Sequence, residues 1–279
     1  MKTKHCLTIK YCITTLMTLM ISISAEAHRA WILPAATVLS GDEPWVTMDA
    51  AVSNDVFHFN HFPLNTKMIS VIGPDGGKVE VQNPHTGKHR STFDLQLKQE
   101  GTYKVYVASN GLTASWEDSE GKRHRWPGRG EQPTPEGFEK DVPKQAEDLQ
   151  VTYSSRRMET FLTAGAPTEK VLELTNAGLE MKPLTHPNDL FSGESTRFQF
   201  LMDGKPAAGT EITVIRGGTR YRNTQEELTL VADKNGLIEI NWTKAGMYWL
   251  EAEFSDDKAA APASKRRGSY VATLEVLPE

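Results

Sequence analysis

Apolar and polar residues alternate along most of this chain, with the two-residue period of β-strands that bury one face. In the first half, alternating runs occupy 45–52, 67–72, 79–81, 93–97, 103–107 and 151–163. In the second half they occupy 198–202, 211–215, 238–242, 248–252 and 270–277. Turn-forming Gly, Pro and Asp residues separate the runs, and no stretch shows a long 3.6-residue period. The pattern therefore predicts an all-β protein.

Two segments of this pattern resemble each other. The run 93–97 is followed by a Gly-x-Tyr turn that ends at Tyr103, and the run 238–242 by one that ends at Tyr248. In Greek-key sandwiches a tyrosine at such a corner can bond its hydroxyl to the nearby backbone. The repeat predicts two similar β-sandwich domains of immunoglobulin-like type; the alternative is that so short an echo arose by chance.

The first sandwich is expected at 28–165 and the second at 166–279. Within the first, residues 114–150 are rich in Pro, Gly and charge and are too long for an ordinary connection. This long loop is either a functional excursion or a mobile segment. Its Trp116 and Trp126 lie near basic residues, which suits an anionic or ring-bearing ligand, or they pin the loop to its own sandwich.

The first 27 residues have the pattern of a secretory signal peptide. Three lysines fall within residues 1–10, the run 11–23 carries no charge, and Ala25 and Ala27 form a small-residue cleavage site. The uncharged run is shorter than the ~20 apolar residues of a transmembrane helix. We therefore expect cleavage before His28 and export of a soluble protein.

The composition bears on disulfides, on nucleic-acid binding and on membrane insertion. Both cysteines, Cys6 and Cys12, lie in the signal segment, so the mature chain is expected to hold no disulfide. The net charge of −5 argues against nucleic acid as a partner. No other long apolar stretch follows, so no membrane insertion of the mature chain is expected.

Cleavage before His28 would create a chelating terminus. Its free α-amine and its imidazole Nδ1 can bind one metal ion together, and a third nitrogen from another histidine would complete a histidine brace. Such a nitrogen set suits tetragonal Cu(II) or Ni(II). The alternative is that His28 is an ordinary chain end that frays or packs.

Three further histidines are candidate metal ligands. His58 and His61 follow the strand 45–52 in a phenylalanine-rich loop, where aromatic side chains would limit access of water. His186 precedes Pro187, which favours an extended backbone from which its ring could reach the first domain. The alternatives are an aromatic-packed loop for the first two and an ordinary turn for the third. His85 and His89 are expected on an exposed hairpin.

No signature of a catalytic site stands in the sequence: it has no His-Glu-x-x-His, no Gly-x-Ser-x-Gly and no phosphate-binding glycine loop. The protein is therefore expected not to be an enzyme. A copper oxidase of polysaccharides built on the same brace is a distant alternative.

Three short segments carry a family resemblance. They are 27–31 (AHRAW), 185–191 (THPNDLF) and 203–209 (DGKPAAG). Together they resemble an uncharacterised bacterial periplasmic family, a domain of unknown function often labelled the periplasmic component of cobalt/nickel transport. The second half is also similar to transthyretin-like or carboxypeptidase-regulatory-like sandwiches. The resemblance implies a periplasmic, non-enzymatic protein that handles a transition metal, with His28 and His186 among the matching residues.

Two hypotheses follow. In the first, the protein is a periplasmic accessory protein that binds Ni(II), Co(II) or Cu(II) through His28 with His61 or His186, and passes the metal to a transporter in the inner or outer membrane. In the second, it is a metal-free binding or scaffold module that uses the loop 114–150 to hold a protein or carbohydrate partner.

Overall fold

The computed structural model describes residues 28–128 and 131–279. The expected signal peptide, residues 1–27, lies outside the described residues. The described part is built from nineteen strands, one short α-helix and three 3-10 turns. This confirms the all-β prediction.

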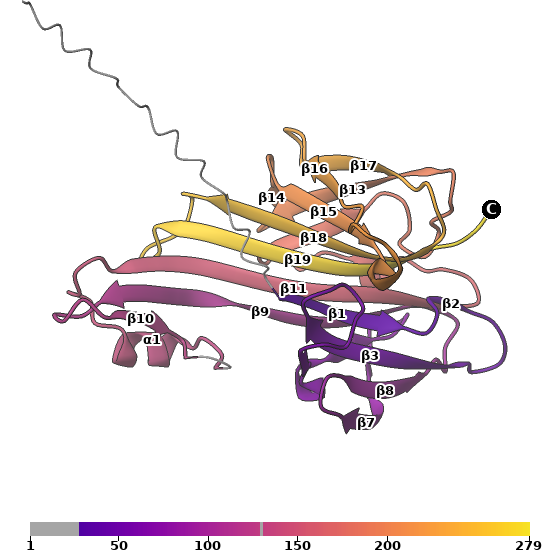
Figure 1. Ribbon diagram of the computed structural model, residues 1–279, viewed down its shortest axis with the longest axis horizontal. Coiled ribbons are helices and arrows are strands. Elements are labelled where there is room, and N and C mark those ends of the chain that lie inside the picture. The colour runs from indigo at the N-terminus through magenta and orange to yellow at the C-terminus, as the bar shows by residue number, and fades with distance from the viewer. Residues whose placement is uncertain (1–27, 129–130) are drawn as a thin grey trace, which may run out of the picture.

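The strands form three sheets (Figure 1). The first sheet contains β1 (Arg29–Pro34), β3 (Trp45–Ser53), β8 (Ser91–Gln96) and β7 (Gln82–Thr86), with β4 (Phe62–Pro63) paired to β3. The central sheet contains, in order, β16 (Leu228–Val231), β15 (Glu211–Arg216), β18 (Gly246–Asp256), β19 (Lys265–Val276), β11 (Gln150–Ala164), β9 (Gly101–Glu117), β5 (Ser70–Ile72) and β6 (Lys78–Val79), with β10 (Arg123–Trp126) on β9 and β2 (Val38–Leu39) on β11. The third sheet contains β12 (Leu179–Pro183), β13 (Ser195–Met202), β14 (Lys205–Pro206) and β17 (Leu237–Asn241). The remaining elements are η1 (Thr66–Met68), α1 (Pro135–Asp141), η2 (Lys170–Leu172) and η3 (Thr219–Tyr221).

The central sheet belongs to both halves of the chain. Strands β11 and β19 pair in parallel from Thr152–Lys265 to Thr160–Thr273. Neighbouring residues of β11 face opposite ways: Leu162 is buried in a core with the first sheet, and Phe161 in a core with the third. The first and third sheets therefore lie on opposite faces of one shared sheet, as Figure 1 shows.

Each of these two layers encloses its own apolar core. The core under the first sheet includes Trp31, Met48, Phe93, Leu95 and Tyr103 and also takes in residues of the second half of the chain, such as Trp249. The core under the third sheet is built around Phe198, Phe200, Trp242, Leu250 and Tyr270. Burial of these large side chains, each typically worth ~1.5–3 kcal/mol, is the main force that stabilises the layers in a fold whose described residues contain no cysteine.

The two predicted tyrosine corners are present. Tyr103 donates its hydroxyl proton to Gln99 O at 2.9 Å, and its oxygen accepts from Gln99 N at 2.8 Å. Tyr248 donates to Lys244 O at 2.6 Å. Both tyrosines follow a glycine of positive φ, Gly101 and Gly246, which turns the chain into the next strand.

Two segments differ from the sequence-based expectation. The predicted strand 67–72 forms strand only at its end, because the Asn65 side chain accepts from Lys67 N and starts the 3-10 turn η1. The predicted loop 114–150 contains the end of β9, β10 and α1. Side chains from this segment, including Trp126 and Phe138, form a third small core with Val151 and Ala263.

Candidate functional site

His28 and His61 meet at the end of strand β3. Strand β1 pairs with one edge of β3 and β4 with the other, so the residues just before β1 and β4 flank the same strand end. The two imidazole rings stack with their centroids 4.0 Å apart and their planes at 10°. Phe62 packs against His61 at 4.6 Å between centroids and forms an apolar wall on one side of the pair.

His89 is the third histidine of this neighbourhood. Its Nδ1 lies 3.1 Å from the carbonyl oxygen of His61. Because a carbonyl oxygen only accepts, Nδ1 carries the proton, and in the neutral ring Nε2 keeps its lone pair. A backbone carbonyl orients many metal-binding histidines in this way. The sequence pattern assigned His89 to an exposed hairpin, and only the pairing of β7, β8 and β3 shows that this hairpin reaches His61.

His58 lies elsewhere on the same loop. Its Nε2 is 3.5 Å from the Arg220 guanidinium, in the segment after β15. A positive charge at that distance opposes the binding of a metal cation at His58. The loop itself is well held, because Asn60 accepts from Asn54 N and donates to Asp55.

His186 is on the opposite face of the central sheet from His28. Its Nε2 lies 3.1 Å from Thr102 Oγ1, and Asn188 N donates to its Nδ1 at 3.2 Å. Thr102 in turn bonds to Thr163, which shares a face of β11 with Phe161 and the third sheet. Burial lowers the pKa of His186. Both ring nitrogens of His186 have hydrogen-bond partners, and His186 does not lie near His28.

The histidine nitrogens at this end of β3 are suitable ligands for a transition metal. In this structure they are not arranged around a common position. The lone pair of an imidazole lies in the ring plane, so two parallel stacked rings do not aim at one point. A shared metal would need the ring of His28 or His61 to rotate. Among the described residues, no three His, Asp or Glu side chains already surround a common position.

A half-buried carboxylate, Glu251, which sequence reasoning missed, lies on β18 near the start of β1. Burial, helped by neighbouring Glu253, raises the pKa of Glu251 to about 7, although the guanidinium of Arg29 opposes the shift. Arg29 itself lies 5.4 Å over the Trp249 ring and donates to Asn54 O. Nothing in the local pattern distinguishes Glu251 from the exposed Glu253 two residues later.

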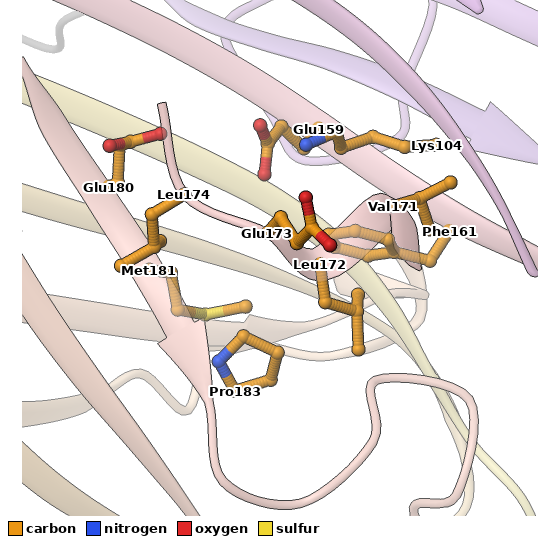
Figure 2. Close-up of a pocket in the computed structure, with 10 residues that line it drawn as sticks. All are labelled: Lys104, Glu159, Phe161, Val171, Leu172, Glu173, Leu174, Glu180, Met181 and Pro183. Carbon is orange, nitrogen blue, oxygen red and sulfur yellow. The ribbon is translucent and has the colours of Figure 1, made fainter. Parts of the chain in front are cut away.

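A second buried group of charges joins the central sheet to the third sheet, and Figure 2 shows two of its members, Glu159 and Glu180, beside a small pocket. Arg157 pairs with Glu159 at 3.1 Å and with Glu180 at 3.3 Å, and Tyr270 donates to Glu159. The cavity beside them, also lined by Lys104, measures about 10 Å³. That is the space of roughly one water molecule, so this cluster has a structural role.

The segment 114–150 folds into an arm at one end of the long strands β9 and β11 (Figure 1). On it, Trp116 stacks on His124 with centroids 5.5 Å apart, and His124 contacts Asp118 at 2.7 Å. Trp126 is buried against Phe138 in the small third core, and the half-buried Trp116 packs against the same core. Both tryptophans therefore help to hold the arm together.

The fold and its histidine pair define an all-β protein of layered sandwiches with a candidate ligand site at one strand end. The chain belongs to the family described as "Domain of unknown function (DUF4198)", whose model matches residues 25–256 and so spans both cores. That description names no metal, activity or partner. No curated protein matches this chain.

Among solved structures, the chain is similar to the D0-D1 domain of intimin, with a TM-score of 0.23 and 12% identity over 88% of this chain and 97% of that one. It is also similar to a DUF3823 family protein from Bacteroides uniformis, with a TM-score of 0.22 and 10% identity over 90% of this chain and all of that one. Likenesses of this size carry no argument about function. Within the described residues, no helix is long and apolar enough to cross a membrane.

Proposed function

We propose that the protein is a periplasmic accessory protein that binds Ni(II), Co(II) or Cu(II) and delivers the metal to a membrane transporter. The observation that carries the proposal is the 4.0 Å stack of His28 on His61. Rotation of one ring would let both imidazoles bind one ion. Cleavage before His28 would add the α-amine as a further nitrogen ligand.

Two features of the neighbourhood support this proposal. His89 is held by the His61 carbonyl in the tautomer that leaves Nε2 able to bind a metal. The site would then consist of nitrogen donors alone, which favours late first-row ions over Mg²⁺ or Ca²⁺. His58 and His186 are not part of this proposed site, because one contacts Arg220 and the other lies across the sheet.

The test is calorimetric titration of Ni(II), Co(II) and Cu(II) into protein purified from the periplasm and shown by intact mass to begin at His28. A variant with one extra alanine before His28 should bind at least about 10-fold more weakly, because the amine moves away while the imidazole stays. His61→Ala should lose as much, and His89→Ala should also lose affinity. His124→Ala, on the distant arm, is the matched control and should bind like the native protein.

Equal metal affinity in the native and extended proteins would exclude the terminus as a ligand. A chain that begins several residues away from His28 would exclude the chelating terminus altogether. Binding should also weaken as pH falls below the ordinary histidine pKa of ~6.5, because protons compete for the ligands.

The arm formed by 114–150 supports a second candidate, a metal-free binding module. It has its own small core, and β10 carries the half-buried His124, stacked on Trp116, on one face and the exposed Arg123 and Arg125 on the other. The exposed cationic face could bind a protein or carbohydrate partner. The same titration separates the two candidates, because this one predicts no specific metal affinity in the native protein.

A further inference from the structure

A cavity opens at the end of the sandwich formed by the second half of the chain, apart from the histidine site. It measures about 100 Å³ and lies between β15, β16 and β18 of the central sheet on one side and the end of β17 in the third sheet on the other. An engineered apolar cavity of ~150 Å³ holds benzene, so a space of this size admits a ligand of a few non-hydrogen atoms.

The lining of this cavity divides into an apolar and a cationic part. Val214, Leu228, Ile240 and Trp242 contribute apolar surface, and Arg216 and Lys244 contribute positive charge. A single carboxylate, Glu226, also lines it. The site therefore suits a ligand that is apolar at one end and negative at the other.

Arg216 is the cation best placed to bind an anion. Glu226 lies 3.9 Å from Lys244 and 3.7 Å from Arg222, so its charge is shared between two other cations. Arg216 makes no ion pair with any residue that the structure describes. Arg216 and Arg222 both act to lower the pKa of Tyr248, although burial raises it on balance, which places positive charge beside the cavity wall.

The loop that carries these groups is rigidly held. Arg222 donates from Nη1 to Gly217 O and from Nη2 to Arg216 O, each at 2.7 Å. Two buried polar atoms of this loop, Arg222 Nε and Gln225 Oε1, have no hydrogen-bond partner among the described residues. Arg222 thereby holds the main chain next to Arg216, a residue that lines the cavity.

We propose that this cavity binds a small monocarboxylate with a short aliphatic chain. The carboxylate would bind Arg216 and Lys244, and the chain would lie against Trp242 and Leu228. A divalent anion such as phosphate fits less well, because half of the lining is apolar and Glu226 would repel the second charge.

Titration of butyrate into the full-length protein, followed by calorimetry and by saturation-transfer NMR of the butyrate methyl, tests this assignment. We expect a dissociation constant on the order of millimolar, as suits so small a ligand. Butyramide, which is neutral and has the same shape, should bind at least about 10-fold more weakly if the charge of the ligand matters. Acetate and octanoate should both bind less well, because one leaves the cavity unfilled and the other exceeds its length.

Two variants locate the site. Arg216→Gln should weaken butyrate binding at least about 10-fold, and Arg197→Gln, an exposed arginine on β13, should leave it unchanged. Leu228→Trp should block binding while keeping every charge, because Leu228 lines the cavity and is exposed to solvent. Leu228→Trp keeps the test valid if Arg216→Gln does not fold. Absence of butyrate binding, or equal binding in Arg216→Gln, Leu228→Trp and the native protein, would overturn the proposal.

Discussion

At the scale of single residues, Glu251 stands out because its pKa is shifted into the range of physiological pH. Its pKa is raised from 4.5 to about 7, chiefly by burial. The folded state therefore holds a proton between pH 4.5 and 7 that the unfolded state has lost. Stability contributed by the neutral carboxyl is present at low pH and is lost as pH rises through this window.

Replacement of Glu251 by Gln should stabilise the protein at pH 8 and have little effect near pH 4.5. The gain at pH 8 is expected to be at most about 3 kcal/mol, the equivalent of a shift of ~2.5 pKa units, because Gln needs no buried charge. Urea unfolding at both pH values measures it, with the exposed Glu239→Gln on β17 as the control. A variant as stable as the native protein at pH 8 would show that Glu251 is solvated in the folded state.

At the scale of elements, each half of the chain contains one tyrosine corner. Sequence reasoning found them because a Gly-x-Tyr turn after an alternating strand is a local signal. What it did not show is that the two corners differ. Tyr103 both donates to and accepts from the backbone of Gln99, and Tyr248 only donates to Lys244 O.

This difference predicts unequal costs for the same substitution. Tyr248→Phe should lower the free energy of unfolding by about 0.5–1.5 kcal/mol, the loss of one hydrogen bond. Tyr103→Phe should cost more, up to about 3 kcal/mol, because it removes two hydrogen bonds between the buried Tyr103 hydroxyl and the Gln99 backbone. Chemical denaturation of both variants measures the costs, and the exposed Tyr221→Phe should have no effect. Equal losses would mean that the Gln99 N–H finds another partner.

At the scale of the whole molecule, the shared central sheet is the dominant feature. The nine paired positions between Thr152–Lys265 and Thr160–Thr273 join the two halves by backbone hydrogen bonds. Arg157 adds a buried ionic link between the central sheet and the third sheet. Each core also contains side chains from the other half of the chain. Trp249 lies in the core under the first sheet, and Phe161 lies in the core under the third sheet.

The protein should therefore unfold in a single cooperative transition. Leu95→Ala lies in one core and Phe200→Ala in the other, and each should destabilise by about 2–5 kcal/mol. Both should lower the same midpoint in thermal and chemical unfolding, whichever half the spectroscopic probe reports on. Two separable transitions, each sensitive to only one of the variants, would contradict this prediction.

The candidate site shows where sequence reasoning reaches its limit. His28 and His61 were chosen for their chemistry, and the structure places them in contact because β1 and β4 pair with the same end of β3. His186 was chosen on equal grounds and lies across the central sheet. His89 was set aside as an exposed hairpin residue and lies beside the pair.

Local alternation by itself determined most strand positions, the all-β class and the two tyrosine corners. These features depend on which face of a residue is buried and on turns of a few residues, and both are encoded within short stretches of chain. The tertiary structure alone decided that β11 and β19 pair in parallel, that one sheet serves both cores and which histidines meet. The physical reason is that alternation specifies a face of a strand but not its partner or register, and these are selected by packing between segments more than 100 residues apart in the sequence.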